Sequence, residues 1–182
     1  MPEYRRARSP GATYFFTVNT HLRQPFLIDA DVRAVLREGI DRVRLTMPFQ
    51  IDAWVLLPDH IHCVWTLPDG DADFSSRWRI IKTIVTQRCG PRLNVPEILS
   101  DRRKQKNQSS LWQHRFWEHQ IRDDEDWRRH MDYIFYNPVK HGYVSRVRDW
   151  KFSSFENAVE KGWYDLAWGS SAPDSILGME ME

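Results

Sequence analysis

Apolar and polar positions alternate or recur in ways that predict the first elements of the chain. Aromatic and β-branched residues dominate positions 12–20, directly after a Pro-Gly turn, which predicts a buried strand. From residue 29 to residue 46 the apolar positions recur at helical spacing behind an aspartate cap, which predicts an amphipathic helix. Residues 49–57 alternate and then run apolar, and a Pro-Asp turn leads into a second apolar run that begins at His60. This pattern predicts a β-hairpin.

The middle of the chain predicts one further helix and one further strand. Apolar positions at helical spacing extend from Asp73 or Ser75 to about Cys89, with arginines and lysines on the remaining surface. Residues 102–108 contain no apolar side chain and predict a flexible basic loop. Aromatic alternation returns in residues 111–122, and its second half predicts a strand.

The last predicted helix carries a tyrosine and an asparagine near its end. Four acidic residues at 123–126 supply an N-terminal cap and favourable charges in the first turn. We expect the helix to end at Tyr136, because the residue before Pro138 is disfavoured in the α region. Tyr133 and Asn137 are four residues apart and can share a face, although with this boundary Asn137 can already lie beyond the last regular turn.

The order of elements indicates the fold class. Strand, helix, strand, strand, helix, strand is the ferredoxin-like or split βαβ pattern. We therefore expect an α+β fold in which an antiparallel sheet has helices on its faces. The expected domain spans residues 1–140, and residues 141–182 form a C-terminal extension that packs on it through aromatic anchors. Because this fold supports many activities, it does not decide the function.

Composition limits the class of protein. A chain of 182 residues with 41% hydrophobic residues can bury one sizeable core, and its formal net charge of +1 gives no indication of a polyanionic partner. Cys63 and Cys89 lack the spacing of a zinc ribbon or a disulfide framework, which fits a reducing compartment. No signal-peptide core is found, and no apolar run approaches the roughly 20 residues of a membrane span. A soluble, cytoplasmic protein is expected.

Positive charge is concentrated locally. From Arg77 to Lys106 there are nine arginines or lysines and two acidic residues, and a basic arm precedes the first strand. Such charges often form only a solvated face, and the alternative is a surface that binds nucleic-acid phosphates. On that alternative the candidate DNA-binding residues are Arg5, Arg6, Arg77, Arg79, Lys82, Arg102, Arg103, Lys104 and Lys106.

Two histidines separated by one isoleucine begin the second strand of the hairpin. In a strand this spacing turns His60 and His62 to the same face. Two neutral imidazoles on one face are half of a metal site, although two ordinary histidines are the commoner explanation. A tyrosine beside such a metal could attack a phosphodiester and form a covalent phosphotyrosine. Tyr133 and Tyr136 lie on the same predicted helix, and an ordinary core tyrosine is the alternative for both.

Three stretches together resemble the REP-associated tyrosine transposases, a branch of the single-tyrosine HUH transposases in which U is an apolar residue. They are residues 57–62, 116–119 and 133–142, and the resemblance spans most of the chain, from residues 4–6 through residues 150–155. It implies a ferredoxin-like nuclease core, a divalent metal such as Mg²⁺ or Mn²⁺, and cleavage of single-stranded DNA beside a REP hairpin. It assigns His60 and His62 as metal ligands and Tyr133 as the nucleophile.

The same resemblance places Asn137 where related transposases carry a third metal ligand, often Gln. Asparagine can coordinate a metal but is one methylene shorter, which leaves the third ligand open. The implied products are a 5′-phosphotyrosine enzyme and a free 3′-OH. A non-catalytic hairpin-DNA-binding protein is the alternative, whereas an RNA-binding module would need an aromatic, Gly-rich strand pattern that this chain lacks. The oligomeric state, monomer or homodimer, stays open.

Overall fold

One antiparallel sheet forms the centre of the protein. The computed structural model describes residues 9–106 and 108–179 of the chain. Four strands pair in the order β2-β3-β1-β4. Their bounds are Thr13–Asn19 for β1, Gln50–Leu56 for β2, His60–Thr66 for β3 and Trp117–Gln120 for β4. This order and pairing confirm the expected ferredoxin-like α+β fold.

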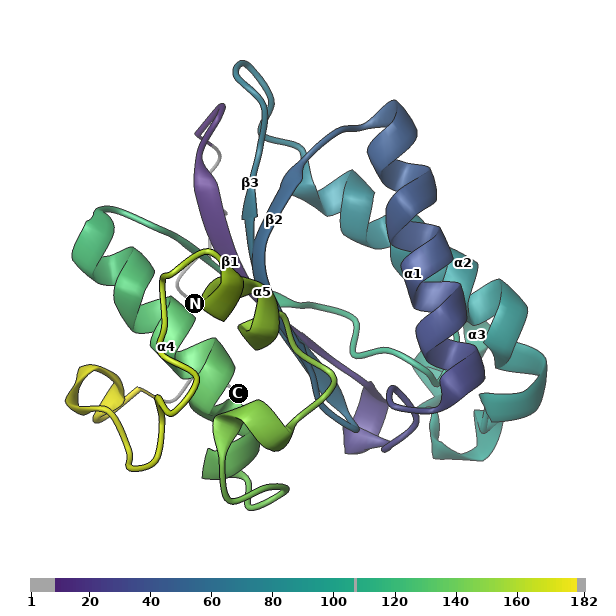
Figure 1. Ribbon diagram of the computed structural model, residues 1–182. Helices are drawn as coiled ribbons and strands as arrows, with labels where there is room; N and C mark the ends of the chain where they lie inside the picture. Colours follow the sequence, from purple (N-terminus) through teal and green to yellow (C-terminus); the bar gives the residue numbers. More distant parts are fainter. Residues whose placement is uncertain (1–8, 107, 180–182) are drawn as a thin grey trace.

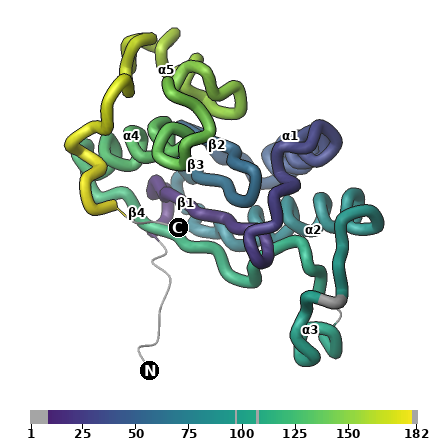
Figure 2. The backbone as a smooth tube through the Cα atoms, turned by 90° about the horizontal axis from the view of Figure 1, so that it is seen from below, coloured from purple at the N-terminus to yellow at the C-terminus, as the bar shows by residue number. Residues whose placement is uncertain are grey.

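Helices cover both faces of the sheet (Figure 1). On one face lie α1 (Ala30–Thr46) and α2 (Phe74–Leu93), and on the other lie α4 (Asp124–Lys140) and α5 (Phe155–Glu160). The short helix α3 (Asp101–Gln105) lies beyond α2, away from the sheet (Figure 2). Single 3-10 turns occur at His21–Arg23, Pro96–Ile98, Val147–Asp149 and Asp174–Ile176. None of the described helices has both the length and the apolar character that a membrane crossing requires.

Strand β1 is buried on both faces, which explains its continuous aromatic run. Tyr14 and Phe16 belong to the core beneath α1 and α2, where Phe16 lies 5.1 Å from Trp65 between ring centroids. Phe15 faces the opposite way, into the core beneath α4. Because successive side chains of a strand point to opposite faces, a strand between two helical layers has no polar face.

Helix α4 continues past the end that the sequence predicted. It runs through Pro138 to Lys140, and Gly142 then adopts a left-handed φ of +72°. Gly142 donates its N–H to the Val139 carbonyl at 2.9 Å. The prediction of an end at Tyr136 was wrong because packing against the sheet outweighs the local preference of the residue before a proline. As a result, Asn137 lies inside the helix.

Helix α2 also differs from its prediction, both in length and in the place of one arginine. It extends to Leu93, beyond the expected end near Cys89. Arg77 is 0% exposed, and its Nη2 lies 2.5 Å from an Asp71 carboxylate oxygen. The same guanidinium donates to the carbonyl oxygens of Met47 and Pro48 at 3.1 and 2.8 Å. Arg77 therefore holds loops together inside the protein, and the prediction that it contacts DNA is corrected.

Helix α3 (Asp101–Gln105) occupies the first part of the basic segment that was predicted to be a flexible loop. Half-buried Arg103 donates to the carbonyl oxygens of Ser109 and Trp112 at 2.9 and 3.1 Å. These bonds satisfy backbone acceptors that no regular element pairs, so Arg103 orders the segment.

The C-terminal extension packs over α4. Phe135 on α4 lies 5.4 Å from Phe155 and 5.2 Å from Tyr164, measured between ring centroids. Trp168 lies 4.7 Å from Tyr164. The last described segment runs alongside α4 in both views (Figures 1 and 2).

We expect Arg77→Met to destabilise the fold strongly without altering DNA affinity per folded molecule. Its loss leaves the Asp71 carboxylate and two carbonyls without their donor, which costs about 3 kcal/mol. Urea denaturation measures the change in the free energy of unfolding. The matched variant Arg79→Met removes an exposed cation from the same helix and should change it by less than about 0.5 kcal/mol. Equal stability of the two variants would contradict the structural role of Arg77.

Candidate functional site

His60 and His62 lie side by side on the sheet face that α4 covers. Their ring centroids are 4.7 Å apart, and the two residues are 1% and 0% exposed. The strand therefore places both imidazoles on one face, as their spacing predicts. They are also inside the protein, so neighbouring groups decide their chemistry.

Each imidazole is held by a partner at Nδ1. The Nδ1–H of His60 donates to an Asp59 carboxylate oxygen at 2.7 Å, which fixes Nε2 as its lone-pair nitrogen. The Nδ1 of His62 lies 2.9 Å from the Thr17 hydroxyl. Burial opposes ionisation of Asp59, but His60 and Arg23 outweigh it and lower the pKa of this carboxyl group. An anion or hydroxyl behind each ring is the arrangement that orients metal-binding histidines.

Two polar groups in the site have no hydrogen-bonding partner among the residues that the structure describes. They are the Nε2 of His62 and the side-chain amide of Asn137, which is 0% exposed. Unpaired polar atoms in such a place are uncommon in folded proteins and indicate a ligand. Imidazole nitrogen together with amide oxygen is a donor set that a divalent cation can accept. These residues therefore fit a metal.

One face of α4 lies against the histidine pair. The Tyr133 ring is 5.2 Å from the His62 ring, and the His141 ring is 5.3 Å from the His60 ring, between centroids. Asn137 lies between Tyr133 and His141 at four-residue spacing, so it faces the same site. The structure thus brings His60, His62 and Tyr133 together, and helical spacing directs Asn137 to the same face.

Lys140 connects this site with the surface. Its Nζ donates to the Tyr133 hydroxyl at 3.4 Å, while Tyr133 itself is 1% exposed. Burial lowers the pKa of His62 well below 6.5, and His60 and His141 when protonated, together with Lys140 and Arg23, lower it further. His62 is therefore neutral at pH 7, the state in which imidazole binds a metal.

Sequence reasoning missed four residues of this site. Asp59, Thr17, Lys140 and His141 each contact one of the selected side chains. Two of them could have been found, because Asp59 directly precedes the histidine pair and Lys140 follows Tyr133 by two helical turns. Thr17 is a partner only through strand pairing, which the sequence does not specify.

The predicted DNA-binding cations differ in exposure. Arg79, Arg102, Lys104 and Lys106 are exposed, whereas the Nζ of Lys82 donates to the Gln113 carbonyl at 2.8 Å. Arg5 and Arg6 lie outside the described residues. Arg103 also contacts His21, which follows β1, with 2.7 Å between Nη1 of Arg103 and Nδ1 of His21.

A second group of side chains could also hold a metal ion. Ligand atoms of His119, Asp126 and His130 lie within 4.8 Å of one another. However, one Asp126 oxygen accepts hydrogen bonds from His119 at 2.8 Å and from the Arg122 side chain at 3.2 Å. Burial raises the pKa of Asp126, but these donors outweigh it and hold the pKa at about 2. A guanidinium on the same oxygen repels a cation, so we interpret this group as a hydrogen-bonded cluster.

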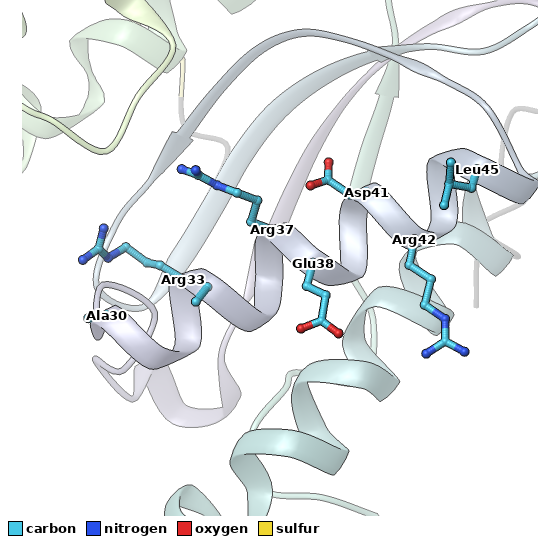
Figure 3. A pocket seen from close by; sticks show the side chains of 8 residues that line it. Ala30, Arg33, Arg37, Glu38, Asp41, Arg42 and Leu45 are labelled. Atoms are coloured by element: carbon cyan, nitrogen blue, oxygen red, sulfur yellow. The ribbon is translucent and has the colours of Figure 1, made fainter.

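The larger surface hollows lie on the opposite side of the sheet. One of about 650 Å³ runs along α1, where Glu38 and Arg42 point toward α2 (Figure 3). Another of about 580 Å³ lies between α1 and the sheet, with Arg37 and Lys151 among the residues that line it. Neither contains the histidine pair.

Comparison with known proteins gives close relatives over nearly the whole chain. A REP-associated tyrosine transposase of Escherichia coli (strain K12) is 46% identical over 178 residues, which cover 98% of this chain and 97% of the relative. A Haemophilus influenzae protein provisionally given the same name is 38% identical over 181 residues, covering 98% and 99%. A solved structure described as a REP-associated tyrosine transposase bound to a REP hairpin matches with a TM-score of 0.78 and 46% identity, covering 96% of this chain and 94% of the other. No family profile matches the chain.

We expect Asp126→Asn to lower the free energy of unfolding by about 2 kcal/mol at pH 7. The folded-state pKa of about 2 lies below the ordinary 3.8, so the ionised carboxylate stabilises the fold above the ordinary pKa. Wild type loses this contribution as the pH falls from about 5 toward 2, whereas the variant has none to lose. Urea titrations between pH 7 and pH 3 should therefore show that the difference in free energy of unfolding between wild type and Asp126→Asn becomes smaller as the pH falls.

The exposed neighbour Asp124 supplies the control, because Asp124→Asn changes the same helical turn without touching the cluster. A gap between wild type and Asp126→Asn that stays constant with pH would contradict the charged cluster.

Proposed function

This chain belongs to the REP-associated tyrosine transposases, and on that premise we propose that it is a metal-dependent endonuclease and strand transferase. Its substrate is single-stranded DNA that carries a REP hairpin. The observation that carries this proposal is the contact, at 5.2 Å between ring centroids, of Tyr133 on α4 with His62 on β3. It supports the proposal because it joins the candidate nucleophile to the candidate metal ligands from a distant part of the chain.

His60, His62 and Asn137 are the proposed ligands of Mg²⁺ or Mn²⁺. The lone-pair nitrogen of His60, the neutral state of His62 and the unpaired amide of Asn137 support this assignment. When bound, the cation supplies Lewis acidity at a non-bridging oxygen of the scissile phosphate. Asp59 and Thr17 hold the two rings in the required orientation.

Tyr133 is the proposed nucleophile. Its oxygen forms a bond to phosphorus while the bond from phosphorus to the 3′-oxygen breaks, leaving a 5′-phosphotyrosine and a free 3′-OH. The phenolic proton is lost from Tyr133 and a proton is gained by the leaving 3′-oxygen. Attack by a 3′-OH on the phosphotyrosine reverses these changes and rejoins a strand.

Lys140 places a positive charge beside the Tyr133 hydroxyl oxygen, the proposed attacking atom. Its ammonium group donates to the phenolic oxygen of Tyr133 and lies 5.0 Å from the centre of the ring. A cation at this place stabilises negative charge that develops on the tyrosine oxygen and the phosphate. Because Lys140 is exposed, an incoming phosphate meets it before the buried tyrosine.

The basic helix α3 lies toward the same end of the sheet as the histidine pair. Arg103 contacts His21, two residues after the end of β1, and Asn19 pairs with His60 across the sheet. Exposed Arg102, Lys104 and Lys106 on this side can therefore bind backbone phosphates of DNA that enters the site. Such contacts position the strand and read no bases.

We expect Mn²⁺ to raise the melting temperature of the wild-type protein by several degrees. Metal bound at 100 times its dissociation constant stabilises a fold by about 2.7 kcal/mol. His62→Ala should abolish the shift, whereas His119→Ala, in the second cluster, should keep it. Thermal melts with Mn²⁺ and with EDTA measure both. The reverse pattern would move the metal to the cluster of His119, Asp126 and His130.

We expect wild type to form a covalent adduct with a single-stranded oligonucleotide that carries a REP hairpin, in the presence of Mn²⁺. Tyr133→Phe should remove the adduct on a denaturing gel, and the matched variant Tyr136→Phe should keep it. His60→Ala should retain hairpin binding and lose cleavage, because this ring contributes to the chemistry rather than to the DNA surface.

Two results would contradict the proposal. Demonstrable hairpin binding with no adduct from wild type would indicate the non-catalytic hairpin-binding protein instead. An adduct that persists in Tyr133→Phe would assign the nucleophile to another residue.

A further inference from the structure

Trp117 is an exposed aromatic residue in line with the candidate site. It opens the edge strand β4 and is 41% exposed. Across the sheet, Trp117 pairs with Thr17, and Thr17 pairs with His62. Two strand spacings separate Trp117 from His62 in this row, or about 10 Å. The indole therefore lies on the same sheet face as the histidine pair, beside the place where a scissile phosphate would bind.

Two histidine rings stack behind the indole. Its ring stacks on His119 with centroids 5.9 Å apart and planes 9° apart, and His119 stacks on His130 at 4.6 Å and 13°. Exposure falls along the stack, since the His119 side chain is 26% exposed and that of His130 is 4%. The hydrogen bond from His119 to Asp126 fixes the middle ring. Trp117 is thus the outer end of an ordered stack.

A second contact joins the stack to the candidate site. Phe15 meets Trp117 edge-on at 5.7 Å, and it also lies 5.5 Å from His62 and 6.1 Å from Tyr133, between centroids. One ring therefore packs against the indole, the ligand candidate and the nucleophile candidate. A ligand on Trp117 would be positioned relative to the reacting groups.

The geometry points to Trp117 as a platform on which one unpaired base of the single-stranded DNA flanking the hairpin stacks, close to the phosphate that is cut. A flat, preordered indole accepts the face of any base at little entropic cost. Arg115, which lies before the strand, is exposed and gives phosphate-binding charge beside the indole. The cluster of His119, Asp126 and His130 then supports this platform rather than a metal.

This inference rests on the proposed function for its substrate, and it is tested by binding alone. Fluorescence anisotropy in EDTA measures the affinity of labelled oligonucleotides in which each nucleotide flanking the hairpin is replaced in turn by an abasic unit. Trp117→Ala should weaken binding of the intact oligonucleotide about 10- to 100-fold, and Trp117→Phe should weaken it less. At one flanking position the abasic unit should weaken binding to the wild-type protein by a similar factor. The same unit should weaken binding to Trp117→Ala almost no further, because the stacking contact is already lost.

Trp163 provides the matched control. Trp163 lies in the C-terminal extension, is 42% exposed and packs on Trp127 of α4. Trp163→Ala should therefore leave DNA affinity unchanged, both for the intact oligonucleotide and for each abasic one. Additive losses at every flanking position, or an equal loss on a hairpin without flanks, would overturn the platform. Coupling between Trp117→Ala and one abasic position, with no covalent adduct, would support the base platform and contradict the proposed nuclease activity. A covalent adduct without that coupling would support the nuclease activity and contradict the platform.

Discussion

The edge-on contact between Tyr133 and His62 depends on one face of helix α4 spanning the histidine pair on strand β3. Tyr133 and His141 are separated by about 12 Å along α4, whereas the two histidines are separated by about 7 Å along β3. The helix face therefore extends past the pair at both ends, with one ring against each histidine. Asn137 falls between them, opposite the pair. Continuation of α4 through Pro138 makes this alignment possible, because an earlier end would release Asn137 from the face.

The same alignment buries polar groups at a cost in stability. An unpaired buried donor or acceptor costs about 1 to 3 kcal/mol, and the amide of Asn137 and Nε2 of His62 lie among the described residues in that state. Apolar packing beside them offsets the penalty, as with Phe15, which is 0% exposed and lies 5.5 Å from His62 between ring centroids. A site of this kind is incomplete by itself and is satisfied by a ligand. In the neighbouring cluster Nε2 of His130 is unpaired too, but the Asp126 carboxylate oxygen already accepts from His119 and Arg122.

Much of this arrangement could be predicted from the sequence, and what could not depends on tertiary packing. The histidine pair and the order of strands and helices along the chain follow from alternation and turns, which are local. The place of Asn137 does not, because burial of α4 outweighs the local effect of Pro138. Arg77 resembles a surface cation by its helical position, and only the loops that fold around it show otherwise. The spacing of Lys140 from Tyr133, two helical turns, can be read from the sequence, but the contact of its Nζ with the Tyr133 hydroxyl is known only from the structure.

The central claim is that the tyrosine placed against the histidine pair forms the bond to DNA. Tandem mass spectrometry of the trapped protein–DNA complex tests it most directly, after trimming of the DNA and digestion with trypsin. Cleavage after Arg129 and Lys140 releases residues 130–140 as one peptide, which contains both Tyr133 and Tyr136. The account predicts fragment ions that place the phosphonucleotide on Tyr133. A phosphonucleotide on Tyr136, or on any other peptide, would contradict it.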